Sequence, residues 1–220
     1  MRFVINEKSV EVASHAGMAA LDFLRQDAGL KGVKHACREG DCGSCVVLLG
    51  RLELGRPIYR AVTSCLLPLG AVENHHVVTV EGLAGSGLSP FQQALADQGG
   101  SQCGFCTPGF VVSFSGHLLE TDDWSLDRAV EAIAGNICRC TGYASIERAM
   151  AEILGGLSEV PEPGRERIEM LIERGLLPAY FSRIPDLLAG FQVEDSSPDV
   201  PPERLVISGG TDLYVQRPDD

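Results

Sequence analysis

The spacing of the cysteines constrains this chain more than any other feature of its sequence. Cys37, Cys42 and Cys45 form a C-x4-C-x2-C run, and a fourth cysteine, Cys65, follows later in the chain. This is the pattern of a plant-type 2Fe–2S site, in which four thiolates converge on two irons while backbone N–H groups point at the sulfurs. A glycine lies in each gap of the run, where it lets the backbone approach a cluster closely. The run therefore predicts one 2Fe–2S cluster.

The other four cysteines form a second set. Cys103 and Cys106 make a C-x2-C pair, and Cys138 and Cys140 make a C-x-C pair. The eight cysteines thus fall into two groups of four with none left over. We interpret the second group as the ligands of a second 2Fe–2S cluster. Two clusters on one small protein suit the movement of single electrons rather than the binding of a substrate.

Cysteines can also form disulfides, bind zinc or simply be buried as free thiols. Disulfides require an oxidising compartment, and no secretory signal is visible in the sequence. Structural zinc also uses C-x2-C pairs, but zinc ribbons usually join C-x2-C to C-x2-C, which the x4-x2 run does not match. Unrelated buried thiols would not gather at ligand spacing. Cluster binding remains the favoured interpretation.

Net charge and the length of the apolar runs argue against several kinds of binding partner. The 220 residues carry a net charge of −12, which argues against nucleic acid or an anionic membrane surface as the partner. No apolar run reaches the ~18 residues that a membrane span needs. The first residues are typical of a strand and lack the apolar core of a signal peptide. We therefore expect a cytoplasmic protein.

Residues 1–82 are expected to form an α+β domain. Apolar and polar residues alternate over 1–13 as in a β-hairpin, and leucines spaced by three predict a helix that ends near Gly29. After the cysteine run, apolar strands are expected over 46–50 and 77–80, and residues 58–62 between them lead to Cys65. This order of elements is that of a β-grasp plant-type 2Fe–2S ferredoxin domain.

Residues 83–157 are expected to form an all-α four-helix 2Fe–2S domain. Ser89 and Gln92 predict a reciprocal capping contact before a helix that begins at Pro90. Thr107 opens the second helix, Ser125 caps a third that extends to Asn136, and the fourth covers 144–154. The two cysteine pairs flank these helices, whose N-terminal N–H groups favour negative charge.

The C-terminal part looks less regular. Residues 158–203 are rich in proline, and only 165–174 have a clear helical pattern, so we expect an extended linker that wraps over a partner or a neighbouring domain. Residues 204–220 look like a strand that runs into a glycine turn. Gly209, Gly210, Thr211 and Asp212 could cradle a pyrophosphate through bare N–H groups, although an ordinary turn fits the same residues.

Three segments together resemble a known family. They are Cys37–Cys45, Gln102–Gly109 and Asn136–Tyr143, and they are similar to the iron–sulfur part of the molybdenum hydroxylases, the xanthine dehydrogenase and aldehyde oxidoreductase family. The resemblance covers about residues 1–156. It implies that a large partner subunit holds molybdopterin and hydroxylates the substrate with an oxygen from water.

The same resemblance implies a route for electrons. They would leave the molybdenum centre one at a time, pass through the cluster of Cys103, Cys106, Cys138 and Cys140, then through the cluster of Cys37, Cys42, Cys45 and Cys65, and reach FAD and then NAD or another acceptor. Gln102 would hydrogen-bond the molybdopterin, and the backbone of 138–142 would lie against it.

The C-terminal turn resembles the first FAD pyrophosphate loop of the bacterial xanthine dehydrogenase small subunit. The sequence reaches Asp220 before almost the whole flavin domain, so we expect a flavin-binding subunit, or the remainder of that domain, to complete the FAD site. A xanthine dehydrogenase-type enzyme is favoured. The alternatives are a stand-alone ferredoxin-like carrier or redox sensor without a molybdenum partner, and a zinc-stabilised interaction module. His75 and His76 are expected to be surface residues.

Overall fold

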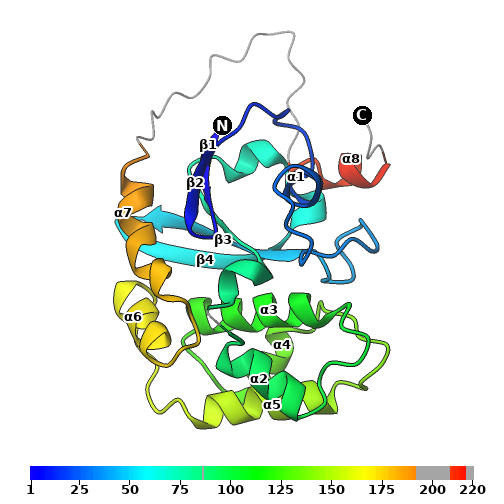
Figure 1. The fold of residues 1–220 in the computed structure, drawn as a ribbon, viewed down its shortest axis with the longest axis vertical. Coiled ribbons are helices and arrows are strands. Elements are labelled where there is room, and N and C mark those ends of the chain that lie inside the picture. Colours follow the sequence, from blue (N-terminus) through cyan, green and yellow to red (C-terminus); the bar gives the residue numbers. More distant parts are fainter. Residues whose placement is uncertain (86, 192–208, 217–220) are drawn as a thin grey trace.

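The computed structural model describes residues 1–85, 87–191 and 209–216. A five-stranded sheet occupies one half of the molecule and a group of helices the other (Figure 1). The sheet half contains β1 (Arg2–Ile5), β2 (Lys8–Glu11), α1 (Ala20–Gln26), β3 (Val46–Glu53), β4 (Arg56–Thr63) and β5 (His76–Val78). The strand order is β2-β1-β5-β3-β4, with β1 and β5 parallel and the other neighbours antiparallel. The predicted hairpin, helix and strands are confirmed in this order.

Both faces of the sheet are covered, which explains its apolar strands. Successive side chains of a strand point to opposite faces. Val47 and Val77 accordingly pack on the side of α1, whereas Val46, Leu48 and Val78 pack into a second core shared with the helical half. A strand buried on both faces is a continuous apolar run rather than an alternating one.

The strand β3 is longer than the sequence predicted and pairs with β4 in a hairpin that was not predicted. The expected strand ended at Gly50, but pairing continues to Glu53, opposite Arg56. Gly50 is required by a close contact, because a Cβ there would lie 2.4 Å from Cε1 of the Tyr59 ring. The two turn residues, Leu54 and Gly55, have φ values of 50° and 80°, as a two-residue type I′ hairpin turn requires.

Four helices follow, as the sequence predicted. They are α2 (Pro90–Asp97), α3 (Thr107–Glu120), α4 (Leu126–Ala132) and α5 (Ala144–Gly155). The capping box before α2 is present: Ser89 Oγ accepts from Gln92 N–H at 3.3 Å, and Gln92 Oε1 accepts from Ser89 N–H at 2.9 Å. α4 ends at Ala132, earlier than expected, and the chain then turns toward the sheet half.

The central helix α3 joins the two halves. Every residue from Gly109 to Leu119 is buried, which is the pattern of a helix surrounded by protein. One side of α3 packs on β3 and β4, and another packs against α4 (Figure 1). The two halves therefore share one hydrophobic core.

Within the predicted 158–203 linker, the helix expected over 165–174 is confirmed as α6, but the residues after it are not extended as predicted. Residues 165–191 contain α6 (Arg165–Glu173), a 3-10 turn (Ala179–Arg183) and α7 (Ile184–Ala189). Leu171 and Phe181 enter the shared core, and Ile184 packs against Val4 of β1. Proline misled the prediction because it is tolerated in the first turn of a helix, where Pro185 lies. Residues 192–203 of the predicted linker lie outside the described part.

A buried arginine attaches this segment to the helical half. Arg167 on α6 is fully buried, and its guanidinium donates to the carbonyl oxygens of Pro161 and Thr121 at 2.7 Å and of Leu119 at 3.3 Å. These three acceptors come from the residues before α6 and from the end of α3. The contact therefore fixes the C-terminal segment across the core.

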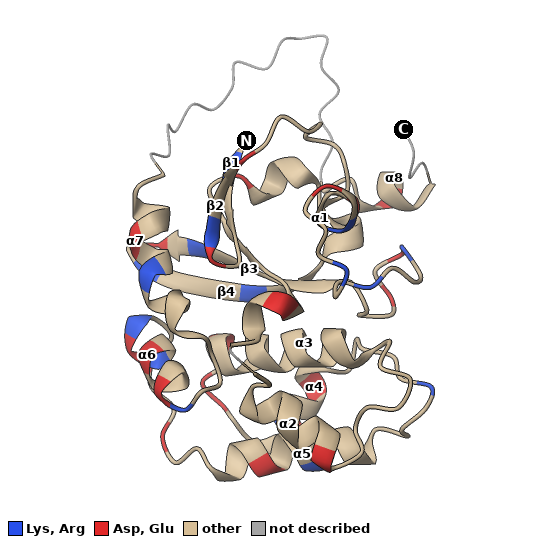
Figure 2. Ribbon diagram, viewed as in Figure 1, with Lys and Arg blue, Asp and Glu red and all other residues tan. Residues whose placement is uncertain are grey.

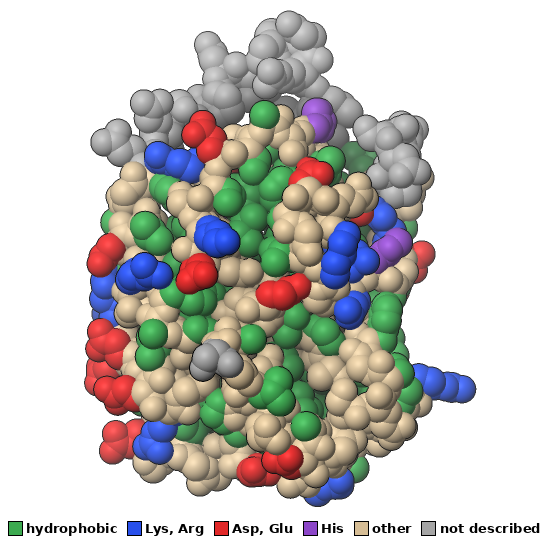
Figure 3. Space-filling model, in the orientation of Figure 1, with side chains coloured by type: hydrophobic (Ala, Val, Ile, Leu, Met, Phe, Trp, Pro, Cys, Tyr) green, Lys and Arg blue, Asp and Glu red, His purple; other side chains and the backbone are tan. Residues whose placement is uncertain are grey.

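Charged side chains are dispersed over the molecule. Acidic and basic residues both occur on α6 (Figure 2), and the two signs are interspersed on the face seen in Figure 3. In the described ranges, no helix is both long and apolar enough to cross a membrane.

Candidate metal centres

Three cysteines of the first set, Cys37, Cys42 and Cys45, lie on the loop between α1 and β3, and the fourth lies on a short turn after β4. The 3-10 turn Ser64–Leu66 carries Cys65. The loop bends sharply, because Arg38, Gly40 and Gly43 have φ values of 61°, 81° and 67°. A Cβ on Gly40 would lie 2.7 Å from Leu66 Cδ1. The glycine thus lets the loop pass close to the turn that carries Cys65.

The thiols of this set gather in two pairs. Cys37 hydrogen-bonds to Cys42, and Cys45 hydrogen-bonds to Cys65. The contact with Cys65 lowers the pKa of Cys45 to about 6, although burial acts in the opposite direction. The same contact raises the pKa of Cys65.

Backbone N–H groups also point at these sulfurs. Glu39 N–H donates to Cys37 Sγ at 3.4 Å. Burial acts to raise the pKa of Cys42, but hydrogen bonds from the backbone of Cys37 and Ser44 outweigh it and lower that pKa. N–H groups aimed at sulfur stabilise thiolates, which are the form that binds metal.

The second cysteine set is also paired. The Sγ atoms of Cys103 and Cys140 are 3.8 Å apart. Cys106, at the start of α3, hydrogen-bonds to Cys138, and burial together with this contact raises the pKa of Cys106 to about 12. The sequence separates the partners of each pair widely, and the fold brings them together.

Two residues that the sequence analysis overlooked support this second set. Thr141 Oγ1 lies 3.1 Å from Cys138 Sγ, and the Tyr143 hydroxyl accepts from Cys138 N–H at 2.9 Å. Burial acts to raise the pKa of Cys138, but hydrogen bonds, first those with Thr141 and then those with Cys140 and Cys106, together outweigh it and lower that pKa. The signal was available, since a hydroxyl residue directly after a C-x-C pair can reach back to its thiols.

The arrangement of the thiols in pairs bears on whether each set would bind a zinc ion or a 2Fe–2S cluster. Within the described ranges, no three His, Cys, Asp or Glu side chains gather around a point as a single-ion site requires. A structural zinc needs four donors around one ion. A 2Fe–2S cluster instead takes two thiolates on each of two irons. Two pairs in each set fit the cluster better than zinc.

The two sets differ in exposure. Cys45 and Cys65 are buried, whereas Cys103 and Cys140 are exposed. Gln102, which directly precedes Cys103, is exposed as well. Two large apolar side chains also lie exposed beside the second set, Phe105 at 45% and Ile137 at 56%. The second set therefore lies at an open, partly apolar edge of the helical half.

The predicted flavin loop is described only in part. Gly209 and Gly210 have φ values of 71° and 68°, and α8 (Thr211–Gln216) follows, with Thr211 and Asp212 in its first turn. α8 packs against the turn that holds Cys65, and the Tyr214 hydroxyl donates to Gly17 O at 2.7 Å. The predicted strand over 204–208 and residues 217–220 lie outside the described part. The start of a flavin domain stays a prediction.

The expectation that His76 is a surface residue is wrong. Its side chain is fully buried between the sheet and the C-terminal segment, and one ring nitrogen lies 2.8 Å from the Tyr59 hydroxyl and the other 2.7 Å from Asn6 O. Burial lowers the pKa of His76 to about 3. The ring is therefore neutral and structural.

Comparisons with known proteins agree with the division of the cysteines. Residues 3–67 match a 2Fe-2S iron-sulfur cluster binding domain, and residues 79–151 match a separate [2Fe-2S] binding domain. Each match contains one complete set of four cysteines. The chain thus has two 2Fe–2S-binding domains in succession.

Named relatives identify the family. Aldehyde oxidase 2 of Cavia porcellus is 42% identical over 66% of this chain and 11% of its own length, and xanthine dehydrogenase 2 of Arabidopsis thaliana is 46% identical over 60% of this chain and 10% of its own length. The solved structure of quinoline 2-oxidoreductase from Pseudomonas putida aligns with a TM-score of 0.61 and 32% identity, over 80% of this chain and 98% of that chain. The chain belongs to the iron–sulfur part of the molybdenum hydroxylases. It is the electron-transfer part of such an oxidoreductase.

The molybdenum hydroxylase relatives are much longer than the matched region. The chain spans about a tenth of the length of the two curated relatives named above.

Proposed function

We propose that the eight cysteines hold two 2Fe–2S clusters and that the chain carries single electrons from a molybdopterin centre on a partner subunit to FAD. Cys37, Cys42, Cys45 and Cys65 would hold one cluster, and Cys103, Cys106, Cys138 and Cys140 the other. The observation that carries this proposal is the gathering of each set into two thiol pairs. When bound, the clusters supply one-electron redox chemistry.

The chain's own residues would prepare these sites. The N–H groups aimed at Cys37 and Cys42 stabilise thiolates in the first set, and Thr141 does so in the second. Hydrogen bonds to cluster sulfurs also tune the potential. Tyr143 holds the backbone of Cys138 in place. The loops are therefore shaped to receive a group that carries negative charge.

The exposed edge beside the second set is the proposed contact with the molybdenum subunit. Phe105 and Ile137 present apolar surface there, and exposed aromatic and aliphatic side chains next to a functional group are typical of an interface. Gln102 lies on the same edge, directly before Cys103, where its amide could hydrogen-bond the molybdopterin. An electron arriving from the partner would enter through this set.

The first set is the proposed exit toward the flavin. α8 lies against the turn of Cys65 and follows the glycine turn Gly209–Gly210. A flavin-binding subunit, or further chain, that continues this segment would bring FAD near Cys65, and NAD or another acceptor would take the electrons from it. Several relatives are named xanthine dehydrogenase, so the complete assembly would be an enzyme of that type, and we expect it in the cytoplasm.

Selective loss of each cluster tests the ligand assignment. Low-temperature EPR of the reduced chain should contain two distinct 2Fe–2S signals. Cys45→Ala should remove one signal and Cys140→Ala the other, whereas Ser44→Ala, next to a ligand but not one itself, should keep both. Retention of both signals in either cysteine variant would refute the assignment of that cysteine.

The partner is tested by copurification. Phe105→Asp and Ile137→Asp should weaken capture of a large molybdenum-containing subunit. Leu126→Asp is the matched control, since Leu126 is also an exposed apolar side chain, at 38%, but lies on α4. Equal capture by all three variants would place the interface elsewhere, and capture of no molybdenum subunit by the unmodified chain would favour a stand-alone carrier.

A further inference from the structure

The two cysteine loops meet directly, although the sequence separates them widely. Ile137 N–H donates to the carbonyl oxygen of Cys42 at 3.0 Å. Cys42 belongs to the first set, and Ile137 is covalently bonded to Cys138 of the second. One hydrogen bond thus joins the backbone of one proposed cluster ligand to the neighbour of another.

A buried side chain reinforces this contact at the adjacent peptide. Asn136 is only 4% exposed, and its Nδ2 donates to Gly43 O at 3.0 Å. The dipeptides 42–43 and 136–137 are therefore linked by two successive hydrogen bonds. The early end of α4 at Ala132 leaves Asn136 outside the helix, where its amide can reach the other loop.

The contact also depends on two missing side chains. A Cβ on Gly43 would lie 2.5 Å from Asn136 Nδ2 and 2.6 Å from Gly135 O. A Cβ on Gly109, in the first turn of α3, would lie 2.4 Å from Gly43 O. Contacts this short with backbone atoms cannot be relieved by a side-chain rotation. Three chain segments approach at this point as closely as their backbones allow.

We propose that Asn136 is a positioning residue that holds the Cys42–Ile137 hydrogen bond as the path for electrons between the two clusters. The inference rests on the proposed function, because it requires both cysteine sets to bind clusters. Each transfer oxidises the cluster of the second set by one electron and reduces that of the first by one electron, with no proton or covalent bond exchanged. The reduced molybdenum centre is the donor and the flavin the acceptor.

Asn136→Leu tests this role, because it removes the amide donor but keeps the number and branching of the side-chain heavy atoms. In the fully reduced chain, the two clusters couple both through space, by dipolar coupling, and through bonds, by exchange coupling, and both split the EPR signals. Only the exchange part of the splitting depends on the Cys42–Ile137 contact. We expect Asn136→Leu to lose the exchange splitting, measured at two microwave frequencies, while each cluster keeps its own g values and its iron. Amide hydrogen exchange at Ile137 should also become faster by about tenfold, the factor that corresponds to one lost hydrogen bond.

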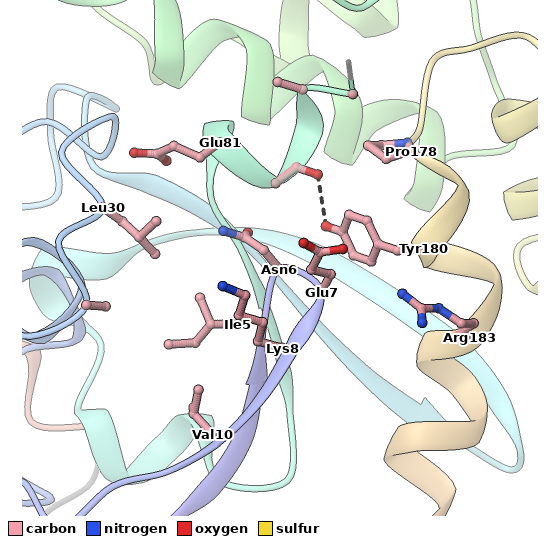
Figure 4. Close-up of a pocket in the computed structure, with 14 residues that line it drawn as sticks. Ile5, Asn6, Glu7, Lys8, Val10, Leu30, Glu81, Pro178, Tyr180 and Arg183 are labelled. Atoms are coloured by element: carbon pink, nitrogen blue, oxygen red, sulfur yellow. Dashed lines mark hydrogen bonds between the residues drawn. The ribbon is translucent and has the colours of Figure 1, made fainter. Parts of the chain in front are cut away.

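Tyr180→Phe is the matched control for this variant. The Tyr180 hydroxyl donates to Gly82 O at 2.9 Å, again from a side chain to a glycine carbonyl distant in sequence (Figure 4). This bond lies beside a cavity of about 710 Å³ between the β1–β2 turn and the C-terminal segment, away from the cysteine loops. Tyr180→Phe should leave the splitting unchanged. If Asn136→Leu and Tyr180→Phe behave alike, Asn136 does not position the path.

If Asn136→Leu fails to fold, a second pair of variants tests whether the contact between the cysteine loops is the path for electrons. Gly109→Ala places a Cβ against Gly43 O and should lose the exchange part of the splitting with Asn136 still present. Gly116→Ala lies on the same helix, but the nearest atoms to its Cβ would be side-chain carbons of Ala61 and Leu48, both at 3.1 Å, and the nearest backbone atom would lie at 3.7 Å, so it should retain the splitting. An unchanged splitting in Gly109→Ala would overturn the inference. Absence of two clusters from the unmodified chain would instead refute the proposed function itself.

Discussion

Replacing Arg167 should destabilise the fold far more than replacing its neighbour on α6, Arg165. Arg167→Met keeps the apolar stem but removes the guanidinium that donates to the carbonyls of Leu119, Thr121 and Pro161. A hydrogen bond to a charged group contributes about 1.5–3 kcal/mol, and a buried acceptor left unpaired costs about 1–3 kcal/mol. Since these contributions overlap, we expect a loss of about 3–5 kcal/mol in the free energy of unfolding.

The ion pair of Arg167 with Asp122 adds little to this figure. The Asp122 side chain is 73% exposed, so solvent screens the pair. Arg165 makes a comparable pair with Asp186, with the two side chains 50% and 75% exposed. Arg165→Met should therefore change the stability by no more than about 1 kcal/mol.

Urea unfolding followed by tryptophan fluorescence measures both variants. The chain has one tryptophan, Trp124, and the Arg167 guanidinium lies 5.5 Å from the centroid of its ring. The signal therefore reports on the site that is changed. If Arg167→Met and Arg165→Met lie within about 1 kcal/mol of each other, the buried carbonyls do not depend on Arg167, and the proposed attachment of the C-terminal segment is wrong.

Other predictions concern two buried histidines and the β3–β4 turn. Tyr59→Phe should lower the free energy of unfolding by about 1–3 kcal/mol, because it leaves a nitrogen of the buried His76 ring unpaired, and a smaller change in urea unfolding would contradict that role. Burial lowers the pKa of His76 to about 3 and that of His117 to about 4. In the folded state both rings therefore stay neutral at pH values at which they take up protons in the unfolded chain. Stability should thus fall as the pH drops from about 6.5 to about 5, by up to about 1.4 kcal/mol per pH unit for each histidine, and His76→Gln should flatten this slope. Leu54→Asn should raise stability by about 0.5–1 kcal/mol, because Leu54 is fully exposed at φ 50° in a turn that favours asparagine, and a thermal midpoint unchanged from that of the unmodified chain would contradict this.

Much of this fold could be read from local signals. The capping box of Ser89 and Gln92 depends on residues three apart, and the structure contains it. The strands around Val46 and Val77 were recognisable as apolar runs. The cysteine spacing divided the thiols into two sets, and the structure pairs thiols within each set, because a loop that wraps a cluster must present its ligands at short intervals.

The remaining features depend on contacts distant in sequence. His76 follows another histidine and looks polar, but the C-terminal segment, with Phe181 against the ring, covers it. The helix α7 begins among prolines and is stabilised by packing on β1 rather than by its own propensity. The bond between Asn136 and Gly43 joins residues 93 positions apart. No local pattern predicts such a contact.

Chemical analysis of the purified chain decides whether the eight cysteines hold two clusters. Two 2Fe–2S clusters require about four irons and four acid-labile sulfides per chain. We expect these amounts together with two distinct EPR signals after reduction. One centre per chain, or zinc without sulfide, would contradict the assignment of the cysteines.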